Sequence, residues 1–140
     1  MVKQFEKEFG EKFGKKNVVA LNSGTTALEL AYLLAGIGKG DEVITPVLTC
    51  TATNLPLVRL DAKIVFADID YDLNINIEDV KKKITKRTKA IVFVHFGGNN
   101  RGLAELLKLC RERGITLIED AAQAVGSDFW GKGDFTAVSL

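Results

Sequence analysis

Short apolar segments, separated by stretches with helical character, constrain the fold of this chain most strongly. Four such segments are "DEVITP" (41–46), "KIVFADI" (63–69), "AIVFVHF" (90–96) and "TLIED" (116–120). Their cores are continuous runs of Val, Ile, Leu and Phe, which is typical of strands that are buried on both faces, as in a parallel sheet. Helices between parallel strands cover the two faces of the sheet. The sequence therefore predicts an α/β fold of three layers, α/β/α, with a mostly parallel sheet.

The remaining elements follow from the spacing of apolar residues. Two more strands are predicted at residues 18–21 and 135–140. Helices are predicted at residues 27–35, which end at a glycine, and at residues 103–113, which Gly114 closes. The chain opens on an amphipathic helix with apolar positions at Val2, Phe5, Phe9 and Phe13. In sheets of this kind ligands bind beyond the carboxyl ends of the strands, so the functional residues are expected there.

Composition excludes some classes of partner. The formal net charge is +1, which gives no reason to expect nucleic acid or a membrane surface as a partner. A basic run at residues 81–89 lacks interleaved aromatic residues and is interpreted as a solvated helix end and turn. The N-terminal residues lack the apolar region of a signal peptide, and no apolar run approaches the roughly 20 residues of a membrane span. Two cysteines without CxxC spacing favour a reducing, cytoplasmic location.

The segment "NSGTT" (22–26) joins a predicted strand to a helix start. Gly24 lets the backbone approach a ligand, and free N–H groups with the hydroxyls of Thr25 and Thr26 would favour an anion there. Plain helix capping by Ser23 or Thr25 is the alternative. The segment is neither a P-loop nor a dinucleotide fingerprint.

Two adjacent carboxylates, Glu119 and Asp120, end the strand "TLIED" and precede "AAQA". A carboxylate in this position requires a metal, a protein cation or a protonated ligand nitrogen. The metal alternative would enlist Asp68, Asp70, Glu119 and His95, whose spacing fits no common zinc or calcium pattern, so no metal is expected. The third alternative, a protonated ligand nitrogen, would suit a pyridinium ring. Asp120 would hold the ring proton, Ala122 would leave a flat surface for the ring, and Gln123 would supply an amide nearby.

Five motifs in this order resemble the DegT/DnrJ/EryC1/StrS family of sugar aminotransferases: "NSGTTAL", "GDEVITP", "VFADIDYDLNI", "TKRTKAIVFVH" and "IEDAAQAVGS". The resemblance extends from about Phe5 to Leu140. It implies a pyridoxal 5′-phosphate (PLP) enzyme of aminotransferase fold type I, similar to aspartate aminotransferase. Residues 1–140 would then form the N-terminal part of the PLP-binding large domain.

The resemblance also implies roles for individual residues. Gly24, Thr25, Thr26 and Ser139 would bind the cofactor phosphate. Asp120, the expected catalytic residue, would pair with the pyridinium nitrogen, and Gln123 would lie near the ring hydroxyl.

The two carboxylates are expected to differ. Successive strand residues face opposite sides, so Glu119 should be held by protein donors. Asp120 should be open to solvent when the cofactor is absent.

Two departures from the family pattern matter. Members commonly carry an aromatic residue stacked on the ring where this chain has Cys50; its thiol would pack on the ring more weakly, or would be a buried apolar contact. The Schiff-base lysine of the family follows the serine matched by Ser139. We therefore expect this chain to lack that lysine, the rest of the large domain and the small domain, and to be inactive alone.

The implied activity of the parent protein is transfer of an amino group from an amino-acid donor to a nucleotide-linked keto-sugar. Glutamate is the first candidate for the donor. The resemblance also implies a homodimer. One alternative is a dehydratase of the same family that acts on such sugars with PLP or pyridoxamine phosphate. Another is a non-catalytic folded fragment or a regulatory descendant. Residues 1–140 contain no motif that separates amino-group transfer from dehydration.

Overall fold

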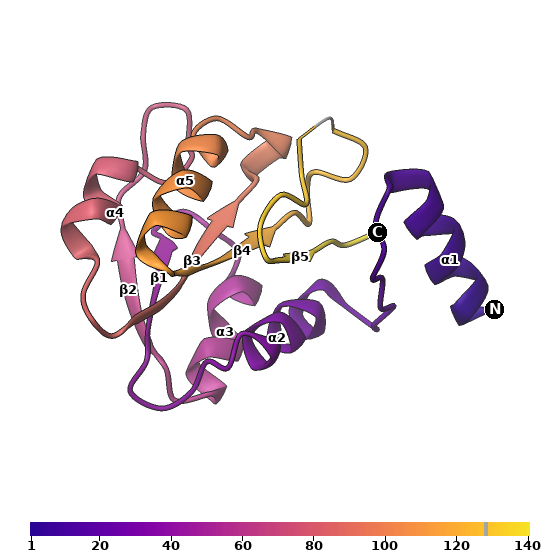
Figure 1. The fold of residues 1–140 in the computed structure, drawn as a ribbon, viewed down its shortest axis with the longest axis horizontal. Helices are drawn as coiled ribbons and strands as arrows, with labels where there is room; N and C mark the ends of the chain where they lie inside the picture. Colours follow the sequence, from indigo (N-terminus) through magenta and orange to yellow (C-terminus); the bar gives the residue numbers. More distant parts are fainter. Residues whose placement is uncertain (128) are drawn as a thin grey trace.

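The computed structural model describes residues 1–127 and 129–140 as a parallel sheet between two layers of helices (Figure 1). The strands are β1 (Glu42–Pro46), β2 (Lys63–Ala67), β3 (Thr88–Val94), β4 (Thr116–Asp120) and β5 (Phe135–Ala137). Their order in the sheet is β2-β1-β3-β4-β5, and every neighbouring pair is parallel. The predicted three-layer α/β/α fold is confirmed.

Helices cover both faces of the sheet (Figure 1). The helices α2 (Gly24–Leu34) and α3 (Thr51–Arg59) lie on one face, and α4 (Ile77–Lys83) and α5 (Leu103–Arg113) lie on the other. Successive residues of β3 alternate between the two cores: Ile91 joins the α4–α5 side and Val92 the α2–α3 side. Because both residues are fully buried, the continuous apolar character of this strand is explained by burial on both faces.

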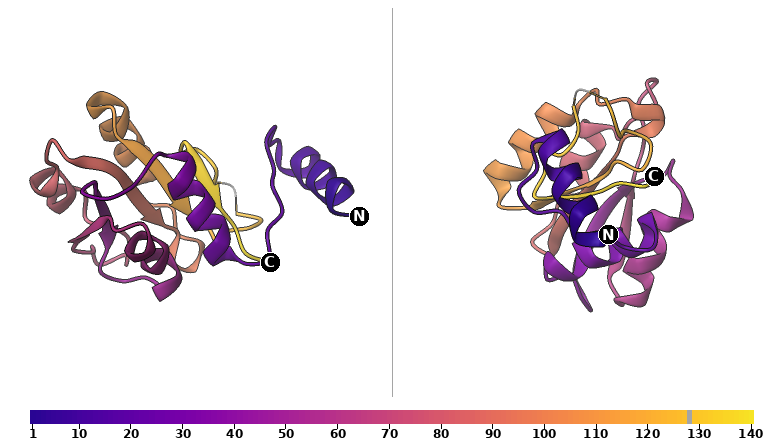
Figure 2. Two further views of the ribbon diagram at one scale, coloured as in Figure 1. Left: turned by 90° about the horizontal axis from the view of Figure 1, so that it is seen from below. Right: turned by 90° about the vertical axis from the view of Figure 1, so that its right-hand side faces the viewer.

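Helix α1 (Val2–Phe13) lies at one end of the molecule, close to the C-terminal end of the chain (Figure 2). It is attached through an aromatic cluster. The ring centroids of Phe9 and Phe13 lie 6.2 and 5.3 Å from that of Trp130. After the helix, the Lys15 ammonium donates to the carbonyl oxygen of Gly131 at 3.0 Å.

The predicted strand at residues 18–21 is wrong. This segment pairs with none of the strands in the described part of the chain, and the Val19 side chain is 62% exposed. Its one backbone anchor is the Ala20 N–H, which donates to the Glu6 carboxylate at 2.8 Å. A groove of about 670 Å³ is lined by residues 18–21 on one hand and by residues of β5 on the other. Strand β5 therefore does not form backbone hydrogen bonds with residues 18–21. An apolar run forms a strand only where a neighbouring strand accepts its hydrogen bonds.

Two helices were not predicted from apolar periodicity. Helix α3 contains Pro56 and two threonines, which disguise its helical pattern. Helix α4 is short and is capped by Asn76, whose side chain accepts a hydrogen bond from the Asp79 N–H at 2.8 Å. The last turn of α4 consists of lysines, which confirms that the basic run begins at a helix end. Across residues 1–127 and 129–140, none of the helices has the length and apolar character to span a membrane.

Candidate functional site

The predicted functional residues gather where three strands end. Val94 of β3, Asp120 of β4 and Ala137 of β5 are neighbours in register. The backbone continues this alignment, because the His95 N–H donates to the Asp120 carbonyl at 3.0 Å and the Ala121 N–H donates to the Ala137 carbonyl at 2.8 Å. Asp120 therefore lies beside the segment that leads to Ser139.

The loop before α2 meets the C-terminal segment of the chain. Ser23 is the N-cap of α2, and its hydroxyl accepts a hydrogen bond from the Thr26 N–H at 3.2 Å. A Cβ atom built on Gly24 would lie 3.3 Å from the Ser139 Cβ, which is tighter than an ordinary contact. Glycine thus permits this close approach, and two predicted phosphate-binding residues from opposite ends of the chain are brought together.

The loop offers a defined set of hydrogen-bond donors. Within residues 1–127 and 129–140, the N–H groups of Gly24 and Thr25 have no hydrogen-bond partner. Thr26 differs, since its N–H is held by Ser23 and its hydroxyl donates to the Asn22 side chain at 2.7 Å. An anion at this helix N-terminus would therefore meet two backbone donors first, with the Thr25 and Ser139 hydroxyls nearby in sequence or space.

Asp120 is buried, so the expectation that it is open to solvent is wrong. It is 6% exposed. One carboxylate oxygen accepts the Thr53 hydroxyl at 2.7 Å and the other accepts the Ala122 N–H at 3.2 Å. Thr53 comes from the first turn of α3, a helix that the sequence did not predict.

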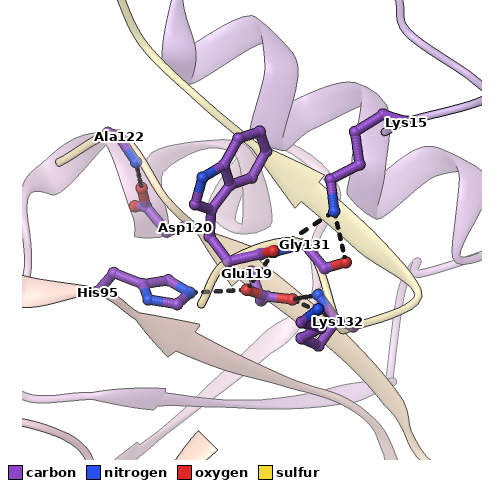
Figure 3. A network of polar contacts seen from close by, with 9 residues as sticks. Lys15, His95, Glu119, Asp120, Ala122, Gly131 and Lys132 are labelled. Atoms are coloured by element: carbon purple, nitrogen blue, oxygen red, sulfur yellow. Dashed lines mark hydrogen bonds and ion pairs between the residues drawn. The ribbon is translucent and has the colours of Figure 1, made fainter. Parts of the chain in front are cut away.

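Glu119 points away from Asp120 and is held by protein donors, as predicted (Figure 3). Its fully buried carboxylate contacts His95 Nε2 at 2.7 Å and accepts the N–H groups of Gly131 at 2.9 Å, Lys132 at 2.5 Å and Gly133. Burial alone would raise the pKa of Glu119, but the hydrogen bonds from His95, Gly133 and Gly131 outweigh it and lower this pKa. Glu119 therefore has a structural role.

Gln123 and Cys50 lie at the same edge of the sheet. The Gln123 side-chain oxygen accepts the Gly97 N–H at 2.7 Å, which leaves its amide NH₂ group at the surface. Cys50 is a free, exposed cysteine at the start of α3, so the alternative of a buried apolar contact is wrong. The roles of both residues toward a ring stay predictions.

The sequence did not identify three contributors to the site: Thr53, His95 as the partner of Glu119, and the backbone of residues 131–133. Thr49 lies in the loop before α3 and Thr53 in its first turn, so their proximity becomes evident only once the path of the chain is known. In the described part of the chain, no cluster of ligating side chains suited to a metal ion occurs.

The arrangement combines an anion cradle with a buried carboxylate at neighbouring strand ends. Gly24 and Ser139 provide the close approach, and Asp120 provides the negative charge. The donor set suits a ligand that carries a phosphate at one end and a protonated nitrogen at the other.

Comparison with known proteins gives consistent matches. A sequence model of the DegT/DnrJ/EryC1/StrS aminotransferase family matches residues 1–139. GDP-perosamine synthase of Vibrio cholerae is 43% identical over 141 residues, which are 99% of this chain and 38% of that protein. The chain thus spans little more than a third of the length of this relative.

Solved structures agree with this result. The crystal structure of 3-amino-5-hydroxybenzoic acid synthase has a TM-score of 0.92 and 36% identity, over 99% of this chain and 38% of that one. The structure of E. coli GDP-4-keto-6-deoxy-D-mannose-3-dehydratase with bound hydrated PLP has a TM-score of 0.86 and 35% identity, over 94% of this chain and 37% of that one.

Proposed function

Because the chain belongs to the DegT/DnrJ/EryC1/StrS aminotransferase family, we propose that it binds pyridoxal 5′-phosphate and serves in amino-group transfer to a nucleotide-linked keto-sugar. The amino donor would be an amino acid, with glutamate as the first candidate. The observation that carries this proposal is the close approach of Gly24 to Ser139, which follows β5, while the buried Asp120 ends the neighbouring strand β4.

Different residues would contact different parts of the cofactor. The Gly24 and Thr25 N–H groups and the Ser139 hydroxyl would donate to the phosphate, with Thr26 as a neighbour that shapes the loop. Asp120 would hold the proton on the ring nitrogen, because a buried carboxylate stabilises an adjacent cation. Gln123 would donate its free amide NH₂ to the ring hydroxyl and Cys50 would pack near the ring. When bound, the cofactor supplies a carbonyl that reacts with amines and a ring that withdraws electrons.

A second candidate is dehydration of a nucleotide-linked sugar with the same cofactor. It is favoured by the likeness to the E. coli dehydratase at a TM-score of 0.86. The residues that would bind the cofactor serve both reactions equally. An assay of the whole protein with one keto-sugar distinguishes them: an aminated product supports transfer, and loss of a hydroxyl group supports dehydration.

Further parts of the proposal concern the whole protein. Residues 1–140 would correspond to the N-terminal part of the cofactor-binding large domain, in line with the share of the relatives that they match. A homodimer would cover the apolar side chains that α2 and α3 leave exposed, among them Leu34 and Val58, and sedimentation velocity would detect it. The two free cysteines support a cytoplasmic location.

The test is binding of pyridoxamine 5′-phosphate, which lacks an aldehyde and so does not react with surface lysines. We expect saturable shifts of the Gly24 and Thr25 amide resonances in NMR titrations. The Asp120→Asn variant should bind about tenfold more weakly or worse, the scale of a hydrogen bond between charged groups.

Asp61→Asn is the matched control, because the Asp61 side chain is 71% exposed and forms an ion pair with the Lys39 ammonium at 3.4 Å. Its affinity should equal that of the unaltered chain. If the Gly24 and Thr25 resonances do not move, or if both variants weaken binding equally, the proposed cofactor site is wrong.

A further inference from the structure

We propose that Thr53 is a positioning residue that fixes the orientation of the Asp120 carboxylate for a cationic ring nitrogen. This role rests on the proposed function of the site. It comes from the surroundings of Asp120, which include two hydroxyl groups of α3 and its preceding loop.

The hydroxyls form a short relay. The Thr53 hydroxyl donates to an Asp120 carboxylate oxygen at 2.7 Å, and Thr49 Oγ1 lies 2.6 Å from Thr53 Oγ1. A threonine hydroxyl has one proton, and an ionised carboxylate only accepts. Since the proton of Thr53 is used on Asp120, Thr49 must be the donor to Thr53. The relay therefore has a single direction, from Thr49 through Thr53 to Asp120, whenever Asp120 is ionised.

Thr53 is itself held rigidly. It is fully buried, and its carbonyl oxygen accepts the Tyr32 hydroxyl at 2.8 Å. Burial, and secondarily the charge of Asp120, raise the pKa of Tyr32, so its hydroxyl keeps its proton and remains a donor. Thr53 also lies in the first turn of α3, where the helix dipole favours a nearby negative charge.

Asp120 has no basic partner in the described part of the chain. Among residues 1–127 and 129–140, no lysine, arginine or histidine forms an ion pair with Asp120. Its donors are a hydroxyl and a backbone N–H, whereas Glu119 next to it is hydrogen-bonded to the His95 ring. A buried carboxylate without a cation is costly. Neutral donors reduce that cost and fix the orientation, while they leave the charge available for a ligand cation.

The experiment compares three α3 variants. Thr53→Val removes the hydroxyl and preserves the shape, Thr53→Ser retains the hydroxyl, and Thr51→Val makes the same change at an exposed position of the same helix. Circular dichroism first establishes that each variant is folded. The probe is pyridoxamine 5′-phosphate labelled with ¹⁵N in the ring, whose chemical shift reports protonation of the ring nitrogen.

We expect Thr53→Val to bind this probe about tenfold more weakly and to shift the ring ¹⁵N resonance toward the unprotonated form, because one hydrogen bond to a charged group is lost. Thr53→Ser and Thr51→Val should match the unaltered chain in both measurements. Equal affinity and equal ¹⁵N shift in Thr53→Val would overturn the role of Thr53.

A second measurement needs no cofactor. In the free chain with ¹³C-labelled aspartate, the Asp120 Cγ resonance should move in Thr53→Val and stay in place in Thr53→Ser and Thr51→Val. An unmoved Cγ resonance in Thr53→Val contradicts the positioning role. If the unaltered chain fails to bind the probe, the proposed function is wrong, whereas the Cγ comparison still decides whether Thr53 positions Asp120.

Discussion

Adjacent residues at the end of β4 serve different purposes because strand geometry sends them to different layers. Glu119 faces the α4–α5 side, where His95 and the N–H groups of residues 131–133 surround it. Asp120 faces the α2–α3 side, where its carboxylate accepts hydrogen bonds from the Thr53 hydroxyl and the Ala122 N–H. Glu119, whose carboxylate has more hydrogen-bond donors than that of Asp120, is thus the residue with the structural role.

We predict that Glu119→Gln destabilises the fold by about 3 kcal/mol, because a buried charge that satisfies several donors is removed and an amide NH₂ is placed against N–H groups. Urea unfolding followed by circular dichroism measures this change. Glu112→Gln is the control, since Glu112 is exposed and its oxygen lies 3.9 Å from Lys108. It should change stability by less than about 0.5 kcal/mol. Equal losses in the two variants would contradict a structural role for Glu119.

At the scale of elements, Glu42 joins the amino ends of three strands. It begins β1 and is 1% exposed. Its carboxylate accepts hydrogen bonds from Thr85 at 2.5 Å and Arg87 at 2.9 Å before β3, and from Lys63 at 3.0 Å in β2. The hydrogen bond from Thr85, followed by that from Lys63, lowers the pKa of Glu42 to about 2.

This lowered pKa predicts a specific loss of stability in acid. Glu42 has an ordinary pKa of 4.5 when unfolded and about 2 when folded, so the unfolded chain binds the proton more readily. The stabilisation is fully present above about pH 4.5 and is lost as the pH falls toward 2. Urea midpoints measured from pH 6 to pH 2 should decline less steeply in Glu42→Gln, which already has a low midpoint at pH 6. Glu11→Gln is the control, because Glu11 is exposed, and its urea midpoints should fall with pH as those of the unaltered chain do. If the midpoints of Glu42→Gln fell in parallel with those of the unaltered chain, the prediction would be contradicted.

The success of sequence reasoning differed between elements for physical reasons. The five strands of the sheet were predicted from their apolar runs. In β1, β3 and β4 these runs are explained by burial on both faces, as in Ile91 and Val92, whereas the edge strand β2 leaves Phe66 48% exposed. Residues 18–21 carry the same pattern, but pairing depends on a neighbour that the local sequence does not reveal. Helix α3 was missed because Pro56 and its threonines hide the period. The burial of Asp120 was missed with it, since Thr53 comes from that helix.

At the scale of the whole molecule, α1 is attached to the sheet domain mainly through Trp130, the single tryptophan of the chain. Its indole is 7% exposed and lies against Phe9 and Phe13. The Lys15 ammonium is 5.0 Å from the centre of the ring. Tryptophan fluorescence therefore reports the attachment of α1.

We predict that Phe13→Ala releases α1 while the sheet stays folded, because the lost aromatic packing is worth about 2 kcal/mol and is confined to this contact. Trp130 emission should shift to longer wavelength, and the far-ultraviolet signal of the sheet domain should persist. Phe5→Ala is the control: Phe5 is 42% exposed and contacts Phe9 on the same helix. An emission spectrum that is unchanged in Phe13→Ala, or shifted equally in both variants, would contradict this attachment.

The meeting of Gly24 with Ser139 has a consequence for the order of events during folding. These residues are far apart in the sequence, so their contact closes a long loop, and we expect it to form after the local helices and the central strands. A contact formed after the transition state influences the unfolding rate rather than the folding rate. An anion bound at this contact would therefore slow unfolding and so prolong the lifetime of the native state. It would leave the folding rate unchanged.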